Sequence, residues 1–322
     1  MTRDDAYERT ESRTDARIRG GWARVLALGL VALAACDGAV TPEHTPVLVV
    51  ESYQVAGELL QPVRLTRTVS VNATFDASAS GVSGAQVRMF LLDEAGEIES
   101  AFPFRETPGA RGVYVSRFGH RVEPLRTYRL EVTDAATGAQ LTAQTLVPGA
   151  FEVVAAGADT VVYQSPRQYE VAVTPSRYPG RQSYYIFSIE ALDPRPAQLT
   201  PFYSDLVDTT GADVHDSLAE FVVNESNIIN EANYDVNPDG TLRVRLPWLA
   251  VAFFGPTRLS VSAIDDNLYD FIRSQTVQQR GSTLSPGEIP NVLEHVTGGH
   301  GVFGSYARIE LSVYVARPPE TP

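Results

Sequence analysis

An alternating pattern near the C-terminus constrains the fold of this chain more than any other feature of the sequence. Between residues 307 and 315, every second residue is apolar: Ala307, Ile309, Leu311, Val313 and Val315. A period of two directs alternate side chains to opposite faces of a strand, so one face is predicted to be buried and the other exposed. Shorter runs with the same period lie at 63–66, 86–91 and 127–132. The chain is therefore predicted to be mainly β.

Turn-forming residues separate the strands of the N-terminal half. The segments 93–96, 107–109 and 134–138 contain the Gly, Pro and Asp residues that favour tight turns. Short strands at this spacing, with no helical period between them, are typical of an antiparallel β-sandwich of about 100 residues. We predict an immunoglobulin-like or fibronectin-like sandwich over residues 47–148, closed by Val147-Pro148-Gly149.

Residues 149–318 are predicted to form a second antiparallel, β-sandwich-like domain in tandem with the first. Its strands are interrupted by a long polar segment, 193–240, that is rich in Asp, Asn and Pro. A helix is predicted over 266–279, because Asp265 or Asp266 can cap its N-terminus and apolar residues recur on one face. The second domain is thus expected to carry one helix and long loops.

The segment Val25–Cys36 indicates where the protein resides. Arginines precede an uncharged apolar run, Val25–Ala35, that is too short for a permanent membrane-spanning helix. Leu33-Ala34-Ala35-Cys36 follows the pattern at which bacterial lipoproteins are cleaved and lipidated. We expect residues 1–35 to be a signal peptide, Cys36 to carry acyl chains such as palmitate, and residues 36–46 to be a lipidated tether. The alternative is a secreted protein whose cleavage site happens to contain a cysteine.

Composition limits the kinds of partner. Cys36 is the only cysteine, so no disulfide is expected. The chain has 26 basic and 39 acidic residues, for a formal net charge of −13. This acidic balance argues against nucleic acid as a partner and against electrostatic docking on anionic lipid. Membrane attachment is therefore expected through the lipid anchor alone.

One segment has a pattern that fits either a metal site or a turn. Asp235, Asn237 and Asp239 alternate before Gly240, as in the opening of a calcium-binding loop. The twelfth position of such a loop should be a bidentate Glu, but here it is Leu246. Asn-Pro-Asp-Gly also suits a type I turn followed by a left-handed glycine in a hairpin. We favour the hairpin, and the three oxygen-bearing residues remain weak calcium candidates.

No catalytic motif is apparent in the sequence. It contains neither a Gly-x-Ser-x-Gly elbow nor a His-Glu-x-x-His pair, and nothing suggests a cofactor. Paired carboxylates for hydrolysis need no local motif, so the 193–240 loops could supply them. A non-enzymatic accessory or binding protein is the leading hypothesis, and an envelope hydrolase using carboxylates from these loops is the alternative.

The segment 298–304 has the most unusual local composition. It contains four glycines, and Gly298, Gly299, His300, Gly301 and Phe303 are candidates for a contact loop. A phosphate-binding loop would follow a strand and open a helix, whereas this segment precedes the terminal strand. We favour a close approach between backbone segments, with Phe303 buried in the core of the second domain.

Several segments together resemble an uncharacterised domain-of-unknown-function family of lipoproteins from Bacteroidota and their relatives. The segments are Val47–Glu51, Pro62–Thr68, Tyr184-Tyr185, Ser262–Asp265 and Gly298–Gly304. The resemblance implies a β-rich outer-membrane lipoprotein that is often encoded near TonB-dependent receptors and has no assigned activity. His300 departs from the family pattern, in which an apolar residue is expected.

The resemblance also suggests a partner and a membrane. A TonB-dependent receptor is the expected partner, with Gly298–Gly304 and Tyr184–Phe187 as candidate contact regions. The outer membrane is the expected location. Asp37, directly after the lipidated cysteine, is an inner-membrane retention signal in some bacteria, so the inner membrane is the alternative.

Overall fold

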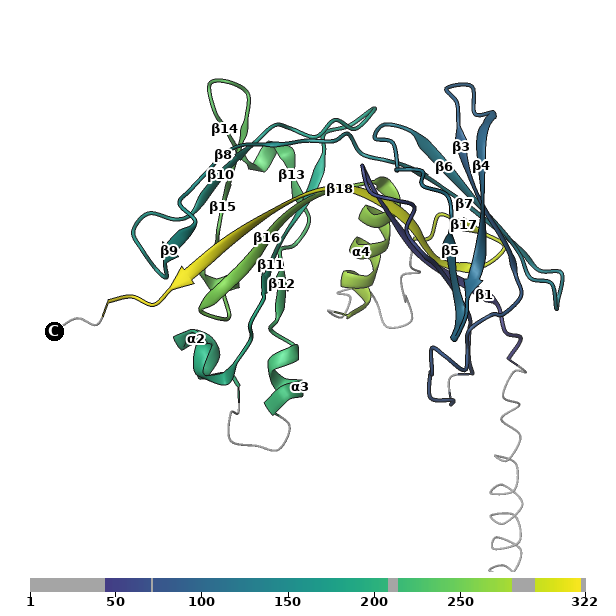
Figure 1. The fold of residues 1–322 in the computed structure, drawn as a ribbon, viewed down its shortest axis with the longest axis horizontal. Helices are drawn as coiled ribbons and strands as arrows, with labels where there is room; N and C mark the ends of the chain where they lie inside the picture. The colour runs from purple at the N-terminus through teal and green to yellow at the C-terminus, as the bar shows by residue number, and fades with distance from the viewer. Residues whose placement is uncertain (1–43, 71, 208–213, 280–292, 320–322) are drawn as a thin grey trace, which may run out of the picture. The chain divides into compact units, whose positions relative to one another are not determined.

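The structure, a computed structural model, describes residues 44–70, 72–207, 214–279 and 293–319 and is mainly β, as the sequence predicts. The signal peptide, Cys36 and Asp37 lie outside these residues. Figure 1 shows the arrangement of the strands. The strands before residue 148 are β1 (Leu48–Val55), β2 (Val63–Arg67), β3 (Gln86–Leu92), β4 (Ile98–Thr107), β5 (Ala110–Ser116), β6 (Thr127–Thr133) and β7 (Gln140–Leu146).

The remaining residues contain more strands and the described helices. The strands are β8 (Val153–Ala156), β9 (Thr160–Val162), β10 (Glu170–Val173), β11 (Tyr184–Ala191), β12 (Val223–Glu225), β13 (Ile229–Asn230), β14 (Asp235–Val236), β15 (Leu242–Arg245), β16 (Gly255–Ile264), β17 (Val296–Thr297) and β18 (His300–Ala316). The α-helices are α2 (Pro201–Ser204), α3 (Val214–Ala219) and α4 (Asp266–Gln279), and 3-10 turns lie at Pro196–Gln198, Glu231–Asn233 and Trp248–Ala250.

The described strands form one large mixed sheet and one small antiparallel sheet. The large sheet has 14 strands in the order β12-β11-β16-β18-β1-β2-β5-β4-β3-β6-β7-β17, with β13 and β9 attached to β11 and β18. The small sheet has the order β14-β15-β10-β8. The 17-residue strand β18 connects the two halves, because its beginning pairs with β1 and its remainder pairs with β16.

The pairing differs from the all-antiparallel expectation at two places. Both β1 and β9 run parallel to β18. Alternation reports which face of a strand is buried, but it does not report which strand lies beside it, so the sequence could not reveal these partners. The division into domains at residues 47–148 and 149–318 stays a prediction, since one sheet continues through both ranges.

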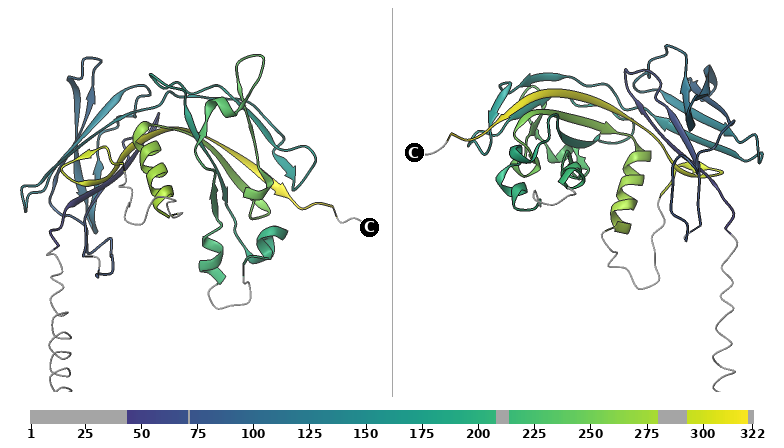
Figure 2. Two further views of the ribbon diagram at one scale, coloured as in Figure 1. Left: turned by 180° about the vertical axis from the view of Figure 1, so that it is seen from behind. Right: turned by 60° about the horizontal axis from the view of Figure 1, so that its bottom comes forward.

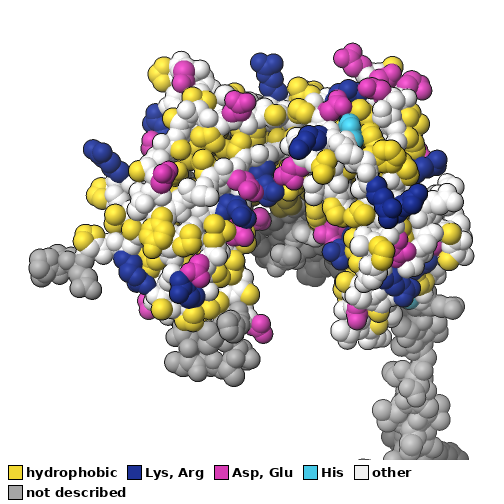
Figure 3. All heavy atoms as spheres, in the orientation of Figure 1, with side chains coloured by type: hydrophobic (Ala, Val, Ile, Leu, Met, Phe, Trp, Pro, Cys, Tyr) yellow, Lys and Arg dark blue, Asp and Glu magenta, His cyan; other side chains and the backbone are white. Residues whose placement is uncertain are grey.

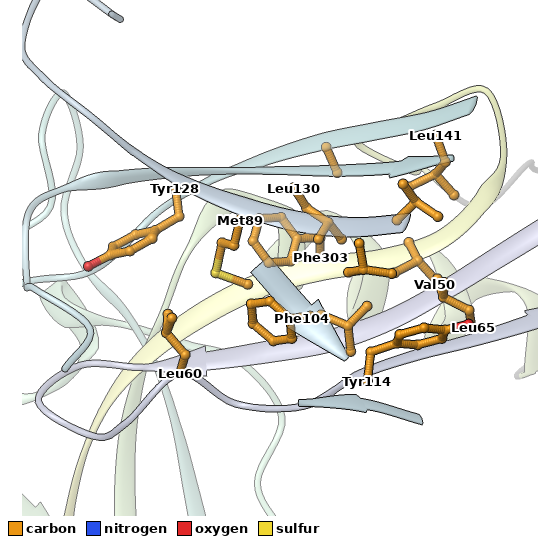
Figure 4. Close-up of a cluster of buried hydrophobic side chains, with 14 of the residues drawn as sticks. Val50, Leu60, Leu65, Met89, Phe104, Tyr114, Tyr128, Leu130, Leu141 and Phe303 are labelled. Carbon is orange, nitrogen blue, oxygen red and sulfur yellow. The ribbon is translucent and has the colours of Figure 1, made fainter. Parts of the chain in front are cut away.

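Two large hydrophobic clusters stabilise the fold. The first gathers side chains from β1 to β7, including Met89, Tyr128 and Leu130 (Figure 4). The second fills the space between the large and small sheets with residues from 151 to 315. Phe303 belongs to the first cluster, where it is 1% exposed, and not to the core of the second half as the sequence suggested. The reason is that the beginning of β18 lies beside β1.

The helix and the hairpin that local sequence patterns predict are present in the structure. Helix α4 occupies the range expected from the sequence, and Asp265 caps it by accepting a hydrogen bond from the Leu268 backbone N–H at 2.9 Å. The segment between β14 and β15 is a hairpin in which Gly240 has a φ of 82°. In the first half, the Tyr128 hydroxyl accepts a hydrogen bond from the Glu123 backbone N–H at 2.9 Å. This is the arrangement of a tyrosine corner.

Candidate functional site

The two segments that the sequence offers as contact regions meet on one face of the large sheet. Tyr184 and Ile186 of β11 pack with Val302 of β18 in a cluster that also contains the first turns of α4. We call five of the partly buried side chains of this cluster the aromatic surface, and they pack against a small buried centre of Ile264, Leu268 and Val302. The aromatic surface consists of Tyr53, Tyr184, Ile186, Tyr269 and Tyr306.

The strand order explains how these residues come together. Tyr184 pairs with Ile264, and Ile264 pairs with Tyr306, so the three form a row across β11, β16 and β18. Residues opposite one another in neighbouring strands share a face of the sheet. Tyr53 of β1 lies beside Gly304 on the same face. Tyr53 and Tyr306, which are 253 positions apart (306 − 53), therefore share one surface because β18 pairs with β1.

Alternation divides the predicted contact region Tyr184–Phe187 between a surface and a core. Tyr184 and Ile186 are partly exposed on the face that carries α4. Tyr185 and Phe187 point to the opposite face, where they are 0% and 4% exposed in the second cluster. Only every second residue of this strand is therefore available to a partner.

An arginine stacked between tyrosines borders the aromatic surface. The guanidinium carbon of Arg181 lies 3.8 Å from the ring centre of Tyr178 and 4.4 Å from that of Tyr184. The Tyr184 ring in turn stacks on Tyr269 at 4.2 Å between centroids. Arg181 Nε donates a hydrogen bond to Asp266 Oδ1 at 2.6 Å. Cation–π contacts of this kind, together with the ion pair, fix the edge of the surface against the start of α4.

Burial and nearby acidic side chains shift the pKa of a tyrosine at this edge. Burial, followed by the nearby carboxylates of Asp265 and Asp266, raises the pKa of Tyr178 far above its ordinary value. Tyr178 also accepts a hydrogen bond from the Asp266 backbone N–H at 3.3 Å. The raised pKa means that the phenol stays protonated to a higher pH than an ordinary tyrosine, and it packs and forms hydrogen bonds at this edge.

Helix α4 is fixed to the sheet by a glycine and an asparagine. A Cβ atom at Gly304 would lie 2.5 Å from Leu268 Cγ, so only glycine lets the helix approach β18 this closely. Asn267 Nδ2 donates hydrogen bonds to the carbonyls of Gln144 at 2.6 Å and Phe303 at 2.7 Å. Figure 2 shows α4 beside β18 from two further directions. These contacts hold α4 against β18 and β7 beside the aromatic surface.

The glycine-rich segment has the tight backbone approach that we favoured. Gly298 and Gly301 have φ values of 81° and 109°. A Cβ atom would lie 2.1 Å from the Gln140 carbonyl at Gly298, and 2.0 Å from the Val50 carbonyl at Gly301. Much of the segment is part of β18 rather than a loop. These glycines allow the backbone to pass neighbouring strands, so their role is in packing.

His300 is the exposed residue of this segment. Its Nδ1 lies 2.7 Å from Glu294 Oε2, and the other oxygen of Glu294 accepts a hydrogen bond from the Gly301 backbone N–H at 3.1 Å. The structure places this polar side chain in a solvent-facing contact with a carboxylate. His300 is therefore available to a partner, whereas Phe303 is not.

The weak calcium candidates contact their own chain. Asp235 pairs with Arg245 at 2.8 Å. Asn237 Oδ1 accepts a hydrogen bond from Arg243, and Asp239 Oδ1 accepts one from the Thr241 backbone N–H at 3.0 Å. Within the described residues, no group of three His, Cys, Asp or Glu side chains is arranged to hold a metal ion. The oxygens thus serve the hairpin.

The carboxylates of the polar segment were the basis of the hydrolase alternative. Glu231 Oε2 accepts a hydrogen bond from the Ser183 backbone N–H at 3.1 Å, and Asp193 pairs with Arg195. These contacts, like those of the hairpin, are structural, and nothing in them favours hydrolysis. Residues 208–213, which belong to the same segment, lie outside the described residues.

None of the described helices is long and apolar enough to cross a membrane.

Sequence reasoning missed several residues of this site. Arg181 lies in a loop with no periodic signal, and Tyr53 pairs with Gly304, which is 251 positions away (304 − 53). Tyr269 and Tyr306 could have been assigned to a face by helical and strand periodicity. Their proximity to Tyr184 depends on the order of the strands, which no local pattern encodes.

Comparison with known proteins identifies one family. A model of the family described as "Domain of unknown function (DUF4249)" matches residues 39–311. No curated protein matches the sequence. Solved structures with some likeness include Salmonella α2-macroglobulin reacted with methylamine, at 9% identity and a TM-score of 0.23 over 85% of this chain. Escherichia coli α2-macroglobulin activated by porcine elastase has 9% identity and a TM-score of 0.21 over 84%. The chain spans 15% and 20% of these two proteins.

Proposed function

The chain belongs to the DUF4249 family, and from this premise we propose that it is a lipid-anchored protein of the cell envelope that binds a partner without catalysing a reaction. The single observation that carries the proposal is the sequence Val25–Cys36, an apolar signal that ends in a lipidation pattern. Two or more acyl chains on Cys36 give stable anchoring, whereas one chain gives only marginal binding. The outer membrane is the proposed location, with Asp37 favouring the inner membrane as the alternative.

The tether restricts where a partner can be. Residues 37–46 span at most about 35 Å when fully extended, so the folded part stays close to the bilayer surface. A membrane-embedded neighbour is therefore the natural partner. We propose a TonB-dependent receptor, on the strength of the resemblance to lipoproteins of Bacteroidota that are often encoded near such receptors.

The aromatic surface is the proposed contact region. Tyrosine and arginine are enriched among the residues that carry most of the energy of protein–protein binding, and this surface combines five partly buried side chains with Arg181 at its edge. Arg308 adds a second cation, 5.3 Å from the ring centre of Tyr306. Figure 3 shows acidic and basic side chains on both parts of the face in view, with a group of acidic ones at the upper right.

We also propose a finer architecture of two tandem β-sandwiches, the first immunoglobulin-like. Support comes from the tyrosine corner at Tyr128 and from the two hydrophobic clusters. Apart from Phe303, the buried residues of the first cluster precede residue 148 and those of the second follow it. The long strand β18 would then be common to both sandwiches.

The experiment is a pull-down of mildly crosslinked, lipidated protein from outer membranes. The wild-type chain should recover a large β-barrel receptor in near-stoichiometric amount. The double variant Tyr53→Ser/Tyr269→Ser should lose it, because both changes remove aromatic area from the proposed surface. Phe75→Ser is the matched control, since Phe75 is 57% exposed outside this surface and should not matter. Recovery of porins alone would contradict the proposed partner.

A further inference from the structure

Strand β18 has one edge that is paired along its length and one that is interrupted. Along the first edge, β16 pairs with it without a break from Tyr306 to Val315. Along the second edge, β1 pairs with it up to Tyr306, and β9 pairs with it from Tyr314 onward. Figure 1 shows β18 extending from β1 to β9. Between these neighbours, no other described strand pairs with the second edge.

The backbone groups that face the interruption can be identified. The Ala56 N–H donates to the Tyr306 carbonyl at 2.9 Å, and the Tyr314 N–H donates to the Asp159 carbonyl at 2.7 Å. Tyr306 and Tyr314 therefore direct their backbone N–H and C=O groups to the second edge. Because the pairing with β16 is unbroken from Tyr306 to Val315, the even-numbered residues between them direct their backbone groups to the same edge. We call the backbone of Arg308, Glu310 and Ser312 on this side the open edge. Among the described residues, no backbone group pairs with it.

The exposed charges of Arg308 and Glu310 could simply protect the open edge from unwanted pairing, as charges often do on edge strands. The burial of the side chains on the inner face of β18 favours a binding role instead. Ala307 and Val313, at the two ends of the interruption, are 2% and 3% exposed. Ile309 and Leu311, between them, are only partly buried although they pack against the second cluster. Apolar side chains are thus incompletely covered where a neighbouring strand is missing.

The shape of the open edge excludes a second copy of this chain as the occupant. The interruption spans residues 307–313, about 23 Å of strand. It is set back between β1 and β9, each of which extends about 4.8 Å further out in the plane of the sheet. Two copies placed edge to edge would bring β1 of one against β9 of the other before the two β18 strands could pair. Only a single extended segment fits between the flanking strands.

We propose that the open edge binds an extended peptide segment of a partner protein, which adds a strand to the sheet between β1 and β9. Its backbone would pair with Arg308, Glu310 and Ser312, as in other cases of β-strand addition. Its side chains would alternate, with apolar residues beside Ile309 and Leu311 and polar or charged residues beside Arg308 and Glu310. The inference deepens the proposed binding function and rests on it for the existence of a partner.

A proline substitution tests the site with little disturbance of the fold. Ser312 directs its N–H to the open edge, so Ser312→Pro removes a donor for the peptide and no bond to β16. Ser312→Ala is the matched control, because it changes the same side chain and keeps the N–H. The probe is a displayed library of seven-residue peptides, selected against the full-length chain. Selected peptides should alternate apolar and polar residues, and they should bind Ser312→Pro at least tenfold more weakly than wild type or Ser312→Ala.

Amide exchange on the wild-type chain gives a second readout that does not depend on folding of the proline variant. Without peptide, the amides of Arg308, Glu310 and Ser312 should exchange faster than those of Ile309 and Leu311, which bond to β16. Bound peptide should slow the first three. The inference is overturned if no peptide is selected, if selected peptides bind Ser312→Pro as well as wild type, or if the first three amides are already slow. None of these measurements uses a membrane, so failure here is distinct from failure of the proposed receptor partnership.

Discussion

Thr145 donates a hydrogen bond from its hydroxyl to Asp265 Oδ2 at 2.5 Å, although the two residues are 120 positions apart. Thr145 lies on β7 and Asp265 caps α4, so the bond joins the two halves of the chain. The Ser305 hydroxyl lies 2.5 Å from that of Thr145. All three side chains are at most 2% exposed. A buried polar group costs free energy unless its bonds are made, so this arrangement favours one relative position of β7, β18 and α4.

Stability should depend on pH through Asp265. Burial raises the pKa of its carboxyl from 3.8 to about 7, and the hydrogen bonds from Thr145 and the Leu268 N–H only partly oppose this. At low pH both the folded and the unfolded chains hold the proton. As pH rises from about 4 to about 7, the unfolded chain releases the proton first, so the free energy of unfolding should fall. Above pH 7 this contribution should be constant.

Asp265→Asn tests this dependence because the amide keeps the cap but does not titrate. At pH 8 the variant should be more stable than wild type by more than about 1.4 kcal/mol, the equivalent of one pKa unit. Denaturant unfolding at pH 4, 6 and 8 measures the difference. Glu94→Gln changes an exposed carboxylate and should follow the wild-type curve. A wild-type stability that rises steadily between pH 4 and pH 7 in step with the Asp265→Asn variant would contradict the prediction.

Two glycines with positive φ should respond differently to alanine. Gly301→Ala would place a Cβ atom 2.0 Å from the Val50 carbonyl, so the pairing of β1 with β18 should be disrupted at a cost on the order of 3 kcal/mol or more. Gly96 has a φ of 83° but nothing within 4 Å of the added atom. Gly96→Ala should therefore cost only about 1 kcal/mol of backbone strain. Thermal unfolding measures the stability that each variant loses. Equal losses would contradict the prediction, because they would mean that backbone strain alone decides the cost.

Removing the proposed lipid attachment should release the protein. Cys36→Ala eliminates the only thiol in the chain, so the variant should move from the detergent-extracted membrane fraction to the soluble envelope fraction. Fractionation followed by immunoblotting measures this. Asp37→Ser, which keeps the cysteine, should remain with membranes. Sedimentation of Cys36→Ala with the membranes would refute the anchor.

Calcium should leave the stability of the protein unchanged. The oxygens of Asn237 and Asp239 accept hydrogen bonds within the hairpin, and Asp235 pairs with Arg245. Calcium added to chelator-treated protein should thus leave the melting temperature within error. A bound ion would stabilise the fold by about 2.7 kcal/mol at a hundredfold excess over its dissociation constant. A clear rise that Asp239→Ala abolishes would restore the calcium interpretation.

The sequence by itself determined the features that depend on near neighbours. The lipidation proposed at Cys36 rests on a linear pattern, which needs no fold to be recognised. Alternation predicted the buried face of β18, apolar spacing after Asp265 predicted α4, and Asn-Pro-Asp-Gly predicted the β14–β15 hairpin. Each of these depends on backbone preferences and contacts within a few residues, so the information is local.

Only the tertiary structure decided which distant segments lie together. Phe303 entered the first cluster, and Tyr53 joined Tyr184 and Tyr269, because β18 lies between β1 and β16. Strands present the same hydrogen-bonding groups to any neighbour, so alternation cannot select the partner. That choice depends on the combined burial of both clusters and on the satisfaction of groups such as Asp265. The open edge has the same origin, since it exists only where β1 ends before β9 begins along β18.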